Sequence, residues 1–299
     1  MSLSKAQIAH LTEKCALVGQ TIVVVGAGGN IGNATCKELA MRGAVVVPSR
    51  TSSEGLEESV ALIQEAGSSS ESCPGGFVMN LVDYESVESG FQQLIKLTEG
   101  KITGVFLNAG GHDKELVIGP EAHFGDTRLE RVVPFFMRNV LGHEHFMRLL
   151  SSKVRDTKGF VGVANTTAAC DGLSRVPHYR MVKAALNQLW QWFAVDHAIK
   201  YQHRFVAVEP GFASMPIESR DLEAQQNSFA VNDPVRFNAI TDQIPLQTSY
   251  VEGVPNWASG EEIADVVANI FSDSSRYVNG TAVRVDAGFG ANKLGNTAV

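Results

Sequence analysis

Short apolar runs alternate with amphipathic segments along most of the chain, and this pattern predicts its elements. The first run, Thr21–Val25, reads TIVVV and ends in a cluster of glycines. A helical pattern follows over Asn33–Arg42, and a second apolar run covers Ala44–Val47. Short β-branched runs are typical of strands that are buried on both faces. This segment therefore predicts two parallel strands joined by a helical crossover.

The same alternation continues toward the C-terminal end of the chain. The further predicted strands are Gly76–Met79, Gly104–Leu107, Gly159–Ala164, Phe205–Val208 and Thr281–Val285. The further predicted helices are Glu85–Leu97, Thr127–Leu150, Val176–Lys200 and Gly260–Phe271. Strands that alternate with helices form a parallel sheet covered on both faces. The predicted fold class is therefore α/β, a doubly wound (Rossmann) parallel sheet of about seven strands in a single domain.

Two segments fall outside this alternation. Residues 4–15 predict a short amphipathic helix, which makes residues 1–18 an N-terminal helical extension of a domain that covers residues 19–299. Residues 214–259 are too long for an ordinary connection. A segment of that length is either a lid over the substrate site or a surface insertion, and the lid is favoured.

Composition excludes several classes of protein. Of the 299 residues, 44% are hydrophobic and 19% are charged, with a formal net charge of −7. This acidic chain has no basic cluster and so does not suit nucleic acid. No apolar run reaches the roughly 18–20 residues of a membrane helix, and the N-terminal sequence has no apolar signal core. The four cysteines lack the spacing of a zinc site, so we expect a cytoplasmic protein without a metal.

A glycine-rich turn joins the first predicted strand to the first predicted helix. Residues 25–32 read VGAGGNIG. Glycines there let the backbone approach a pyrophosphate, which rests on the N–H groups at the start of the helix. In this position we predict dinucleotide binding rather than a simple turn. The predicted contacts in the turn are Gly26, Gly28, Gly29, Asn30, Ile31 and Gly32.

The residues at the end of the second strand indicate which dinucleotide binds. A carboxylate there binds the ribose hydroxyls of NAD, whereas a cation accommodates the 2′-phosphate of NADP. This chain has Ser49 and Arg50 at that point, with no acid before Glu54. Both side chains can bind phosphate, unless Arg50 is an ordinary solvated arginine. We expect NADP(H) as the cofactor, with NAD(H) as the alternative.

Tyr179 and Lys183 lie four residues apart at the start of a predicted helix. This spacing places the phenol and the ammonium on one helical face. A free tyrosine has a pKa of about 10, and a neighbouring positive charge favours its phenolate. The pair could therefore act as a general acid or base at neutral pH. Because such a pair also arises by chance, its position in the fold carries the weight.

Taken together, these motifs resemble the short-chain dehydrogenase/reductase family from about Thr21 to Gly290. The resemblance is also carried by Asn108-Ala109-Gly110, Asn139-Val140-Leu141-Gly142, Thr166-Thr167, Pro210-Gly211, Glu261-Glu262-Ile263-Ala264, Tyr277-Val278-Asn279-Gly280 and Val285-Asp286-Ala287-Gly288. It implies hydride transfer between a nicotinamide and the carbon of a ketone or secondary alcohol. It also implies a small-molecule substrate and a homodimer or homotetramer, whose interfaces use the helix of Tyr179 and the long helix before it.

The resemblance assigns roles to individual residues. Tyr179 would exchange a proton with the substrate oxygen, and Lys183 would lower its pKa and hold the nicotinamide ribose. Asn139 would support a water that relays protons. Either Thr166 or Thr167 would orient the substrate oxygen. Further cofactor contacts are implied at Asn80, Leu81, Asn108, Ala109, Gly110, Pro210, Gly211, Phe212 and Ser214.

The chain departs from the family pattern at some of these positions. Asn30 stands where the family turn has glycine, and asparagine tolerates positive φ better than other non-glycine residues. Asn80 replaces an aspartate, and threonine replaces the substrate-orienting serine. Two alternatives therefore stay open: a catalytically silent NADP-binding sensor or scaffold, and an enoyl reductase that reduces C=C. The intact Tyr179 and Lys183 favour the carbonyl reaction.

Histidines occur at two further points near the predicted site. His112 and Lys114 follow the Asn-Ala-Gly motif on the side where ligands enter an open α/β sheet. They could bind an anionic or hydroxyl-rich substrate, or belong to a solvated polar loop. His143 and His145 lie on the long predicted helix, but their spacing turns the rings to different faces. We therefore expect no metal site there.

Overall fold

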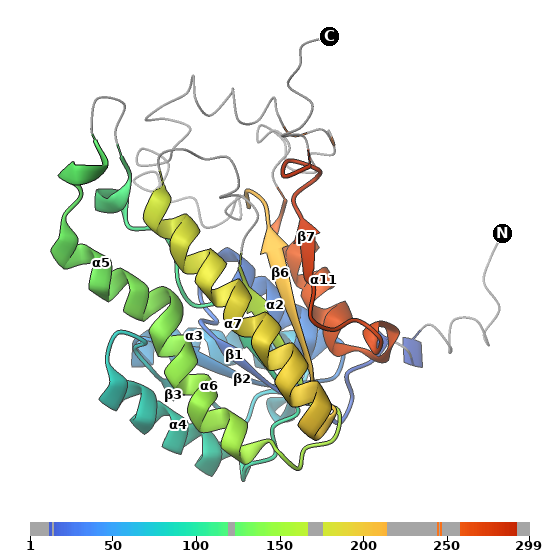
Figure 1. The fold of residues 1–299 in the computed structure, drawn as a ribbon. Coiled ribbons are helices and arrows are strands. Elements are labelled where there is room, and N and C mark those ends of the chain that lie inside the picture. The colour runs from blue at the N-terminus through green and yellow to red at the C-terminus, as the bar shows by residue number, and fades with distance from the viewer. Residues whose placement is uncertain are drawn as a thin grey trace.

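A seven-stranded parallel sheet lies at the centre of this computed structural model (Figure 1). The structure describes residues 12–13, 15–118, 123–166, 176–213, 244, 246 and 258–291. The strands are β1 (Thr21–Val25), β2 (Val45–Arg50), β3 (Phe77–Val78), β4 (Gly104–Leu107), β5 (Val161–Asn165), β6 (Arg204–Pro210) and β7 (Ala282–Val285). Their order is β3-β2-β1-β4-β5-β6-β7, and all neighbours are parallel.

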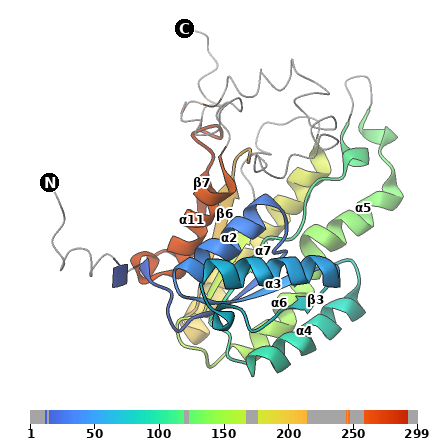
Figure 2. The same ribbon diagram turned by 180° about the vertical axis from the view of Figure 1, so that it is seen from behind.

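Helices cover both faces of the sheet. The face toward the viewer in Figure 1 carries α4 (Tyr84–Thr98), α6 (Gly142–Lys153) and α7 (Pro177–Tyr201). The opposite face, toward the viewer in Figure 2, carries α2 (Gly29–Met41), α3 (Ser53–Ala66) and α11 (Gly260–Phe271).

Each face of the sheet has its own cluster of buried apolar side chains. Val23 and Val25 of β1 belong to one cluster, whereas Ile22 and Val24 belong to the other. This division follows from the strand geometry, because successive side chains point to opposite faces. The apolar runs are continuous because both faces are covered. The predicted fold class, a doubly wound sheet in one domain, is confirmed.

Trp190 anchors α7 to the sheet. Its ring is buried and contacts Phe193 and Phe205 edge-on, with ring centres 5.8 and 5.2 Å away. Its indole N–H donates a hydrogen bond to the Gly162 carbonyl of β5 at 3.3 Å. Large aromatic side chains contribute much of the energy of a core, and a buried indole needs a partner for its N–H. This packing fixes the helix that carries Tyr179.

The apolar pattern does not predict α3. α3 follows Ser52, whose Oγ accepts a hydrogen bond from the Gly55 N–H at 3.2 Å and caps the helix. Ser59 occupies a buried position on its inner face, where Arg50 donates a hydrogen bond to it at 3.0 Å. This polar residue interrupts the apolar row by which an amphipathic helix is recognised.

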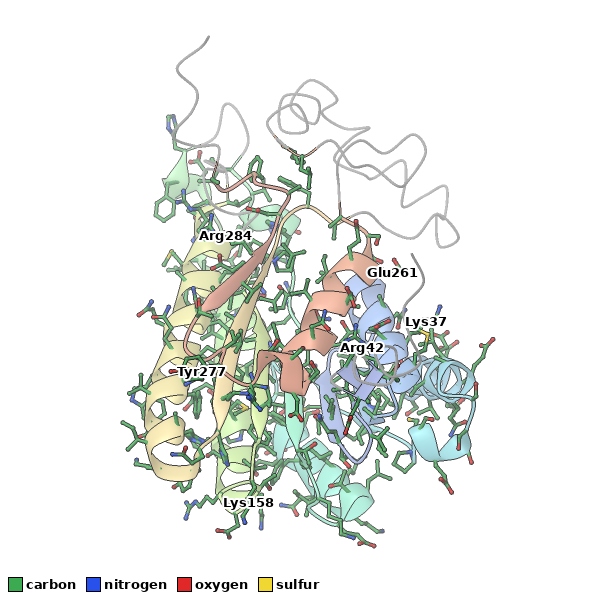
Figure 3. The ribbon with its side chains drawn as sticks, turned by 90° about the vertical axis from the view of Figure 1, so that its right-hand side faces the viewer. Lys37, Arg42, Lys158, Glu261, Tyr277 and Arg284 are labelled. Carbon is green, nitrogen blue, oxygen red and sulfur yellow. The ribbon has the colours of Figure 1, made fainter. Side chains whose placement is uncertain are left out.

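Arg42 joins the end of α2 to α11. Its guanidinium donates hydrogen bonds to Asp265 and, at 2.7 Å, to Asn269 Oδ1, and Figure 3 shows it between the two helices. At the other end of α2, a Cβ built on Gly260 would lie 2.4 Å from Asn30 Oδ1. α11 therefore supports the first turn of α2 directly.

Two predicted segments lie almost wholly outside the described residues, namely the helix over 4–15 and the lid over 214–259. The residues that flank the second segment are described: Ala213 and Ala258 form an isolated parallel bridge. The Ala258 N–H also donates a hydrogen bond to the Phe212 carbonyl at 3.0 Å. Across the described ranges, no helix is both long enough and apolar enough to cross a membrane.

Candidate active site

The glycine turn lies at the carboxyl end of β1, between the ends of β2 and β4. Gly26 has a φ of 83° and Gly29 a φ of 74°, which lie in the region that favours glycine. A Cβ on Gly26 would lie 2.6 Å from the Ala109 backbone, so the turn contacts the Asn-Ala-Gly segment after β4. Asn30 lies inside the first turn of α2, which begins at Gly29, four residues before the predicted helix start at Asn33. Its replacement of glycine therefore requires no positive φ.

The start of α2 has the properties of an anion site. Gly28 caps this helix without a side-chain hydrogen bond. The first N–H groups of a helix have no partner within the helix, and its dipole makes this end positive. A Cβ on Gly28 would lie 2.6 Å from the Arg50 guanidinium, so glycine lets the cation approach the turn. These features fit the pyrophosphate of a dinucleotide.

A cavity of about 260 Å³ opens beside the turn. Its walls contain nine of the predicted cofactor contacts: Gly26, Gly28, Ser49, Arg50, Asn80, Leu81, Asn108, Ala109 and Gly110. The structure thus brings together residues from the ends of β1, β2, β3 and β4. Arg138, which the sequence analysis did not single out, also lines this cavity.

The other predicted cofactor contacts do not line this cavity or lie outside the described residues. Those that do not line this cavity are Gly29, Asn30, Ile31, Gly32, Tyr179, Lys183, Pro210, Gly211 and Phe212. Phe212 lines a second cavity together with Arg284 and Asp286. Ser214 lies outside the described residues.

Ser49 and Arg50 end β2 at the wall of the cavity. The Ser49 hydroxyl is buried and accepts a hydrogen bond from the Gly26 N–H at 3.2 Å, so it stabilises the turn. Arg50 Nη2 lies 3.8 Å from the exposed Glu58 carboxylate. A Cβ on Gly55 would lie 2.6 Å from the same nitrogen. The guanidinium is therefore held between the glycine turn and the start of α3.

A chain of hydrogen-bonded asparagines connects the turn to Lys183. Asn108 Nδ2 donates a hydrogen bond to the Gly26 carbonyl at 2.8 Å, and Asn165 Nδ2 donates to Asn108 Oδ1 at 2.9 Å. The Asn165 carbonyl accepts a hydrogen bond from Lys183 Nζ at 2.9 Å. Sequence reasoning missed Asn165, although a polar residue at the carboxyl end of an apolar strand was the signal that could have found it.

Tyr179 and Lys183 lie in the first two turns of α7. Lys183 Nζ lies 5.5 Å from the centre of the Tyr179 ring, and the lysine is buried. An ammonium within about 6 Å of an aromatic ring interacts favourably with it. The same charge favours the phenolate form of a neighbouring tyrosine. The pair is therefore arranged for proton transfer.

Asn139 lies in a π-helix, Met137–Leu141, between α5 (Leu129–Phe136) and α6. π-Helical turns are rare and often occur at functional sites. Asn139 Oδ1 accepts a hydrogen bond from the Gly111 N–H at 3.0 Å, and its Nδ2 donates to the Phe135 carbonyl at 3.0 Å. Asn139 therefore holds the backbone that follows the Asn-Ala-Gly segment.

Of the two threonine candidates, only Thr166 lies within the described residues. Thr166 is buried, and its hydroxyl donates a hydrogen bond to the Val208 carbonyl of β6 at 3.3 Å. Thr167 lies outside the described residues. The choice between these two residues for orienting the substrate oxygen stays a prediction.

His143 supports the Asn-Ala-Gly segment that follows β4. Its ring is buried, and its Nε2 lies 2.7 Å from the Ala109 carbonyl, so this nitrogen carries the proton and donates the bond. Burial lowers the pKa of His143 to about 4, and the Lys183 ammonium contributes in the same direction. His143 is therefore a neutral structural residue at pH 7.

We expect His143 to make the fold less stable in acid. The unfolded histidine titrates at about pH 6.5, whereas the folded one titrates at about 4. Between these values only the unfolded chain binds the proton, so stability is full above pH 6.5 and falls as the pH drops toward 4. The effect is at most about 3 kcal/mol.

His143→Gln keeps a donor for the Ala109 carbonyl but does not titrate. Its urea midpoint should drop less than that of the wild type between about pH 7.5 and about pH 5. Equal drops would contradict the assignment.

Comparison with known proteins places the chain in a family. Residues 26–290 match the family described as enoyl-(acyl carrier protein) reductase. The chain is 28% identical over 275 residues to levodione reductase from Leifsonia aquatica, covering 90% of this chain and 93% of that protein. It is 26% identical to L-rhamnose 1-dehydrogenase (NAD(P)(+)) from Azotobacter vinelandii, covering 92% and 98%. L-Sorbose reductase from Gluconobacter frateurii, solved with NADPH and L-sorbose, has a TM-score of 0.76 at 20% identity, covering 92% and 98%.

The parallel sheet, the glycine turn and these relatives define an oxidoreductase with a Rossmann fold. The chain belongs to the short-chain dehydrogenase/reductase family, as its motifs predict.

Proposed function

We propose that the protein transfers hydride between NADP(H) and the carbon of a ketone or secondary alcohol. The observation that carries this proposal is the pair of Tyr179 and Lys183, with the ammonium 5.5 Å from the phenol ring. When bound, the nicotinamide supplies or accepts the hydride. Tyr179 donates a proton to the carbonyl oxygen in reduction, and takes the proton of the alcohol in oxidation.

Lys183 supports Tyr179 by its charge. The Asn165 carbonyl holds Nζ at 2.9 Å, and the amide chain through Asn108 connects it to the glycine turn. A buried ammonium in this position favours the phenolate, so Tyr179 can release its proton, or be present as a phenolate base, closer to neutral pH than a free tyrosine. Asn139 keeps the backbone at Gly111 in place. In the proposed reaction, Asn139 also supports a water that relays protons.

Arg50 and the start of α2 would hold the phosphates of the cofactor. The N–H groups of the first turn of α2 suit the pyrophosphate, and the Arg50 guanidinium suits a 2′-phosphate. No carboxylate ends β2, since Ser49 and Arg50 stand there, which favours NADP(H) over NAD(H).

Arg50→Ala should weaken the binding of NADPH by about 10- to 100-fold, because a charged hydrogen bond to phosphate is lost. NADH lacks that phosphate, and its binding should change by no more than about threefold. Calorimetric titration of both cofactors measures this. Ser59→Ala is the matched control, because it removes the hydrogen bond of Arg50 to α3 but leaves the cation. Equal losses for NADPH and NADH would contradict the phosphate contact.

A second candidate is the reduction of a C=C bond, favoured by the description of the matching family as enoyl reductases. A panel with an acetoacetyl thioester and a crotonoyl thioester separates the two reactions. Turnover of the first supports carbonyl reduction, whereas turnover of the second alone supports enoyl reduction. Cofactor binding without any turnover would support a silent sensor.

We also propose a cytoplasmic homodimer or homotetramer. The exposed apolar side chains Trp192, Val195 and Ile199 lie on one side of α7, at helical spacing. An apolar stripe of this kind suits an interface between copies of the chain.

A further inference from the structure

His112 packs against the face of Tyr179. The two ring centres are 3.9 Å apart and the ring planes are tilted by 33°, so the rings are in direct contact. His112 keeps part of its surface open to solvent, whereas this contact covers one face of the phenol. The imidazole therefore forms a wall of the site beside the group that exchanges the proton.

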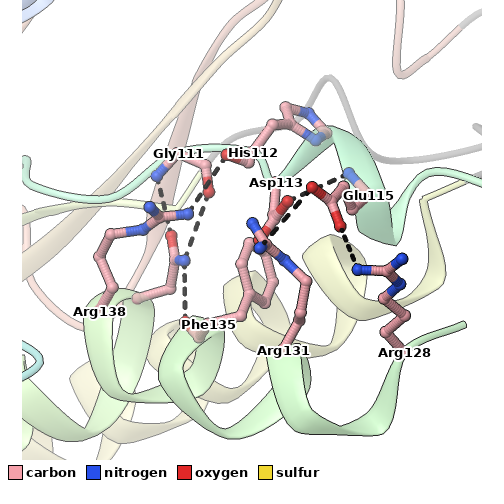
Figure 4. Close-up of polar contacts among 9 residues, drawn as sticks. Gly111, His112, Asp113, Glu115, Arg128, Arg131, Phe135 and Arg138 are labelled. Atoms are coloured by element: carbon pink, nitrogen blue, oxygen red, sulfur yellow. Dashed lines mark hydrogen bonds and ion pairs between the residues drawn. The ribbon is translucent and has the colours of Figure 1, made fainter.

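The loop that carries His112 is fixed to α5 and the π-helix by arginines (Figure 4). Arg138 Nη2 donates a hydrogen bond to the His112 carbonyl at 3.2 Å. Arg131 donates two hydrogen bonds to Asp113 Oδ2, at 2.8 and 3.0 Å. In Figure 4 the His112 ring points away from these arginine side chains. The position of the His112 ring over Tyr179 is therefore fixed through the His112 carbonyl and through the neighbouring Asp113.

The surroundings of the ring keep His112 neutral. Asp113 and Glu115 of the loop pair with Arg131 and Arg128. His112 is exposed as a residue, but the partial burial of its ring and the Lys183 ammonium lower the pKa of the imidazole below its usual range. A neutral imidazole offers one hydrogen-bond donor and one acceptor. Within the described ranges, no hydrogen bond occupies either of its ring nitrogens.

We propose that His112 determines specificity by hydrogen-bonding a hydroxyl group next to the reacting carbonyl. The inference rests on the proposed function, because the carbonyl oxygen must meet Tyr179. A polar ring in contact with the phenol lies beside the substrate carbon attached to that oxygen. A hydroxyl on the neighbouring carbon is then within its reach. The substrate class is therefore an α-hydroxyketone, or a vicinal diol in the reverse direction.

The neutral ring favours this class over an anionic substrate, which a neutral imidazole does not attract by charge. The names of two similar proteins agree with it. L-Rhamnose and L-sorbose, which appear in those names, are polyhydroxylated molecules.

The test compares matched ketones that differ by hydroxyl against methyl. Hydroxyacetone and butanone form one pair, and 2-hydroxycyclohexanone and 2-methylcyclohexanone form another. With NADPH, His112→Phe should lower the preference for the hydroxylated ketone, measured as the ratio of kcat/KM values, by about tenfold. The loss should lie in KM for the hydroxylated ketone. The methyl ketone should change by no more than about threefold, because phenylalanine keeps the ring contact with Tyr179. His112→Gln keeps a donor and an acceptor and should restore part of the preference.

Two results would overturn the role of His112. One is an unchanged preference in His112→Phe, and the other is an equal loss with both members of each pair, which would make the ring only a support for Tyr179. Failure of the proposed function looks different. Tyr179→Phe would then reduce these ketones as fast as the wild type, or the wild type would reduce none of the four. Either outcome removes this inference as well.

Discussion

Replacing Tyr179 with phenylalanine should lower kcat for ketone reduction by about a thousandfold, because general acid catalysis is lost. The change removes only the hydroxyl. The ring keeps its contact with His112, and its centre still lies 6.4 Å from that of Phe135. Steady-state reduction of a ketone with NADPH measures the effect.

The control for this variant is binding of NADPH. Tyr179 does not line the cavity beside the glycine turn, so the affinity for NADPH should be preserved within about threefold. A variant that binds NADPH but does not turn over would support a proton-transfer role. Turnover at the wild-type rate would remove Tyr179 from the chemistry.

Gly26→Ala should lower the free energy of unfolding of the cofactor-free protein by about 3 kcal/mol. Two costs combine at this position. The φ of 83° is strained for any residue with a Cβ, and the new Cβ would lie 2.6 Å from the Ala109 backbone. The backbone after β4 must therefore move away from the turn, and NADPH binding should weaken with it. Urea unfolding measures the first effect.

Gly29→Ala is the matched control. Gly29 has a similar φ of 74°, but a Cβ there would meet no atom of the described residues within 4 Å. This variant should lose only the conformational term, about 1 kcal/mol. A loss as large as that of Gly26→Ala would mean that strain alone, rather than the contact with Ala109, sets the cost.

Much of the fold was predictable because its determinants are local. Strands covered on both faces need continuous apolar runs, and Thr21–Val25 is such a run. The Gly26 turn and the four-residue spacing of Tyr179 and Lys183 are likewise visible in a few neighbouring positions. α3 was not predicted because a polar residue, Ser59, occupies a buried position on its inner face. Ser59 is tolerated there because it accepts a hydrogen bond from Arg50 of the preceding strand.

The site was less predictable because its contacts join distant segments. Asn108 and Asn165 are 57 residues apart in the chain, and nothing local to either residue indicates the other. The contact of His112 with Tyr179 likewise depends on Arg131 of α5 and Arg138 of the π-helix. The π-helix around Asn139 has no local signal either, since its sequence suits an ordinary helix.

The bridge between Ala213 and Ala258 has an evolutionary consequence. Ala213 lies three residues after the end of β6, and Ala258 lies two residues before the start of α11. The bridge therefore pairs the two ends of segment 214–257 with each other. The entropic cost of closing a loop grows only with the logarithm of its length, by about 0.6 kcal/mol for each doubling. Insertions and deletions between these two alanines therefore cost the domain little. Related chains can therefore differ in the length of this segment while the sheet and its covering helices stay the same.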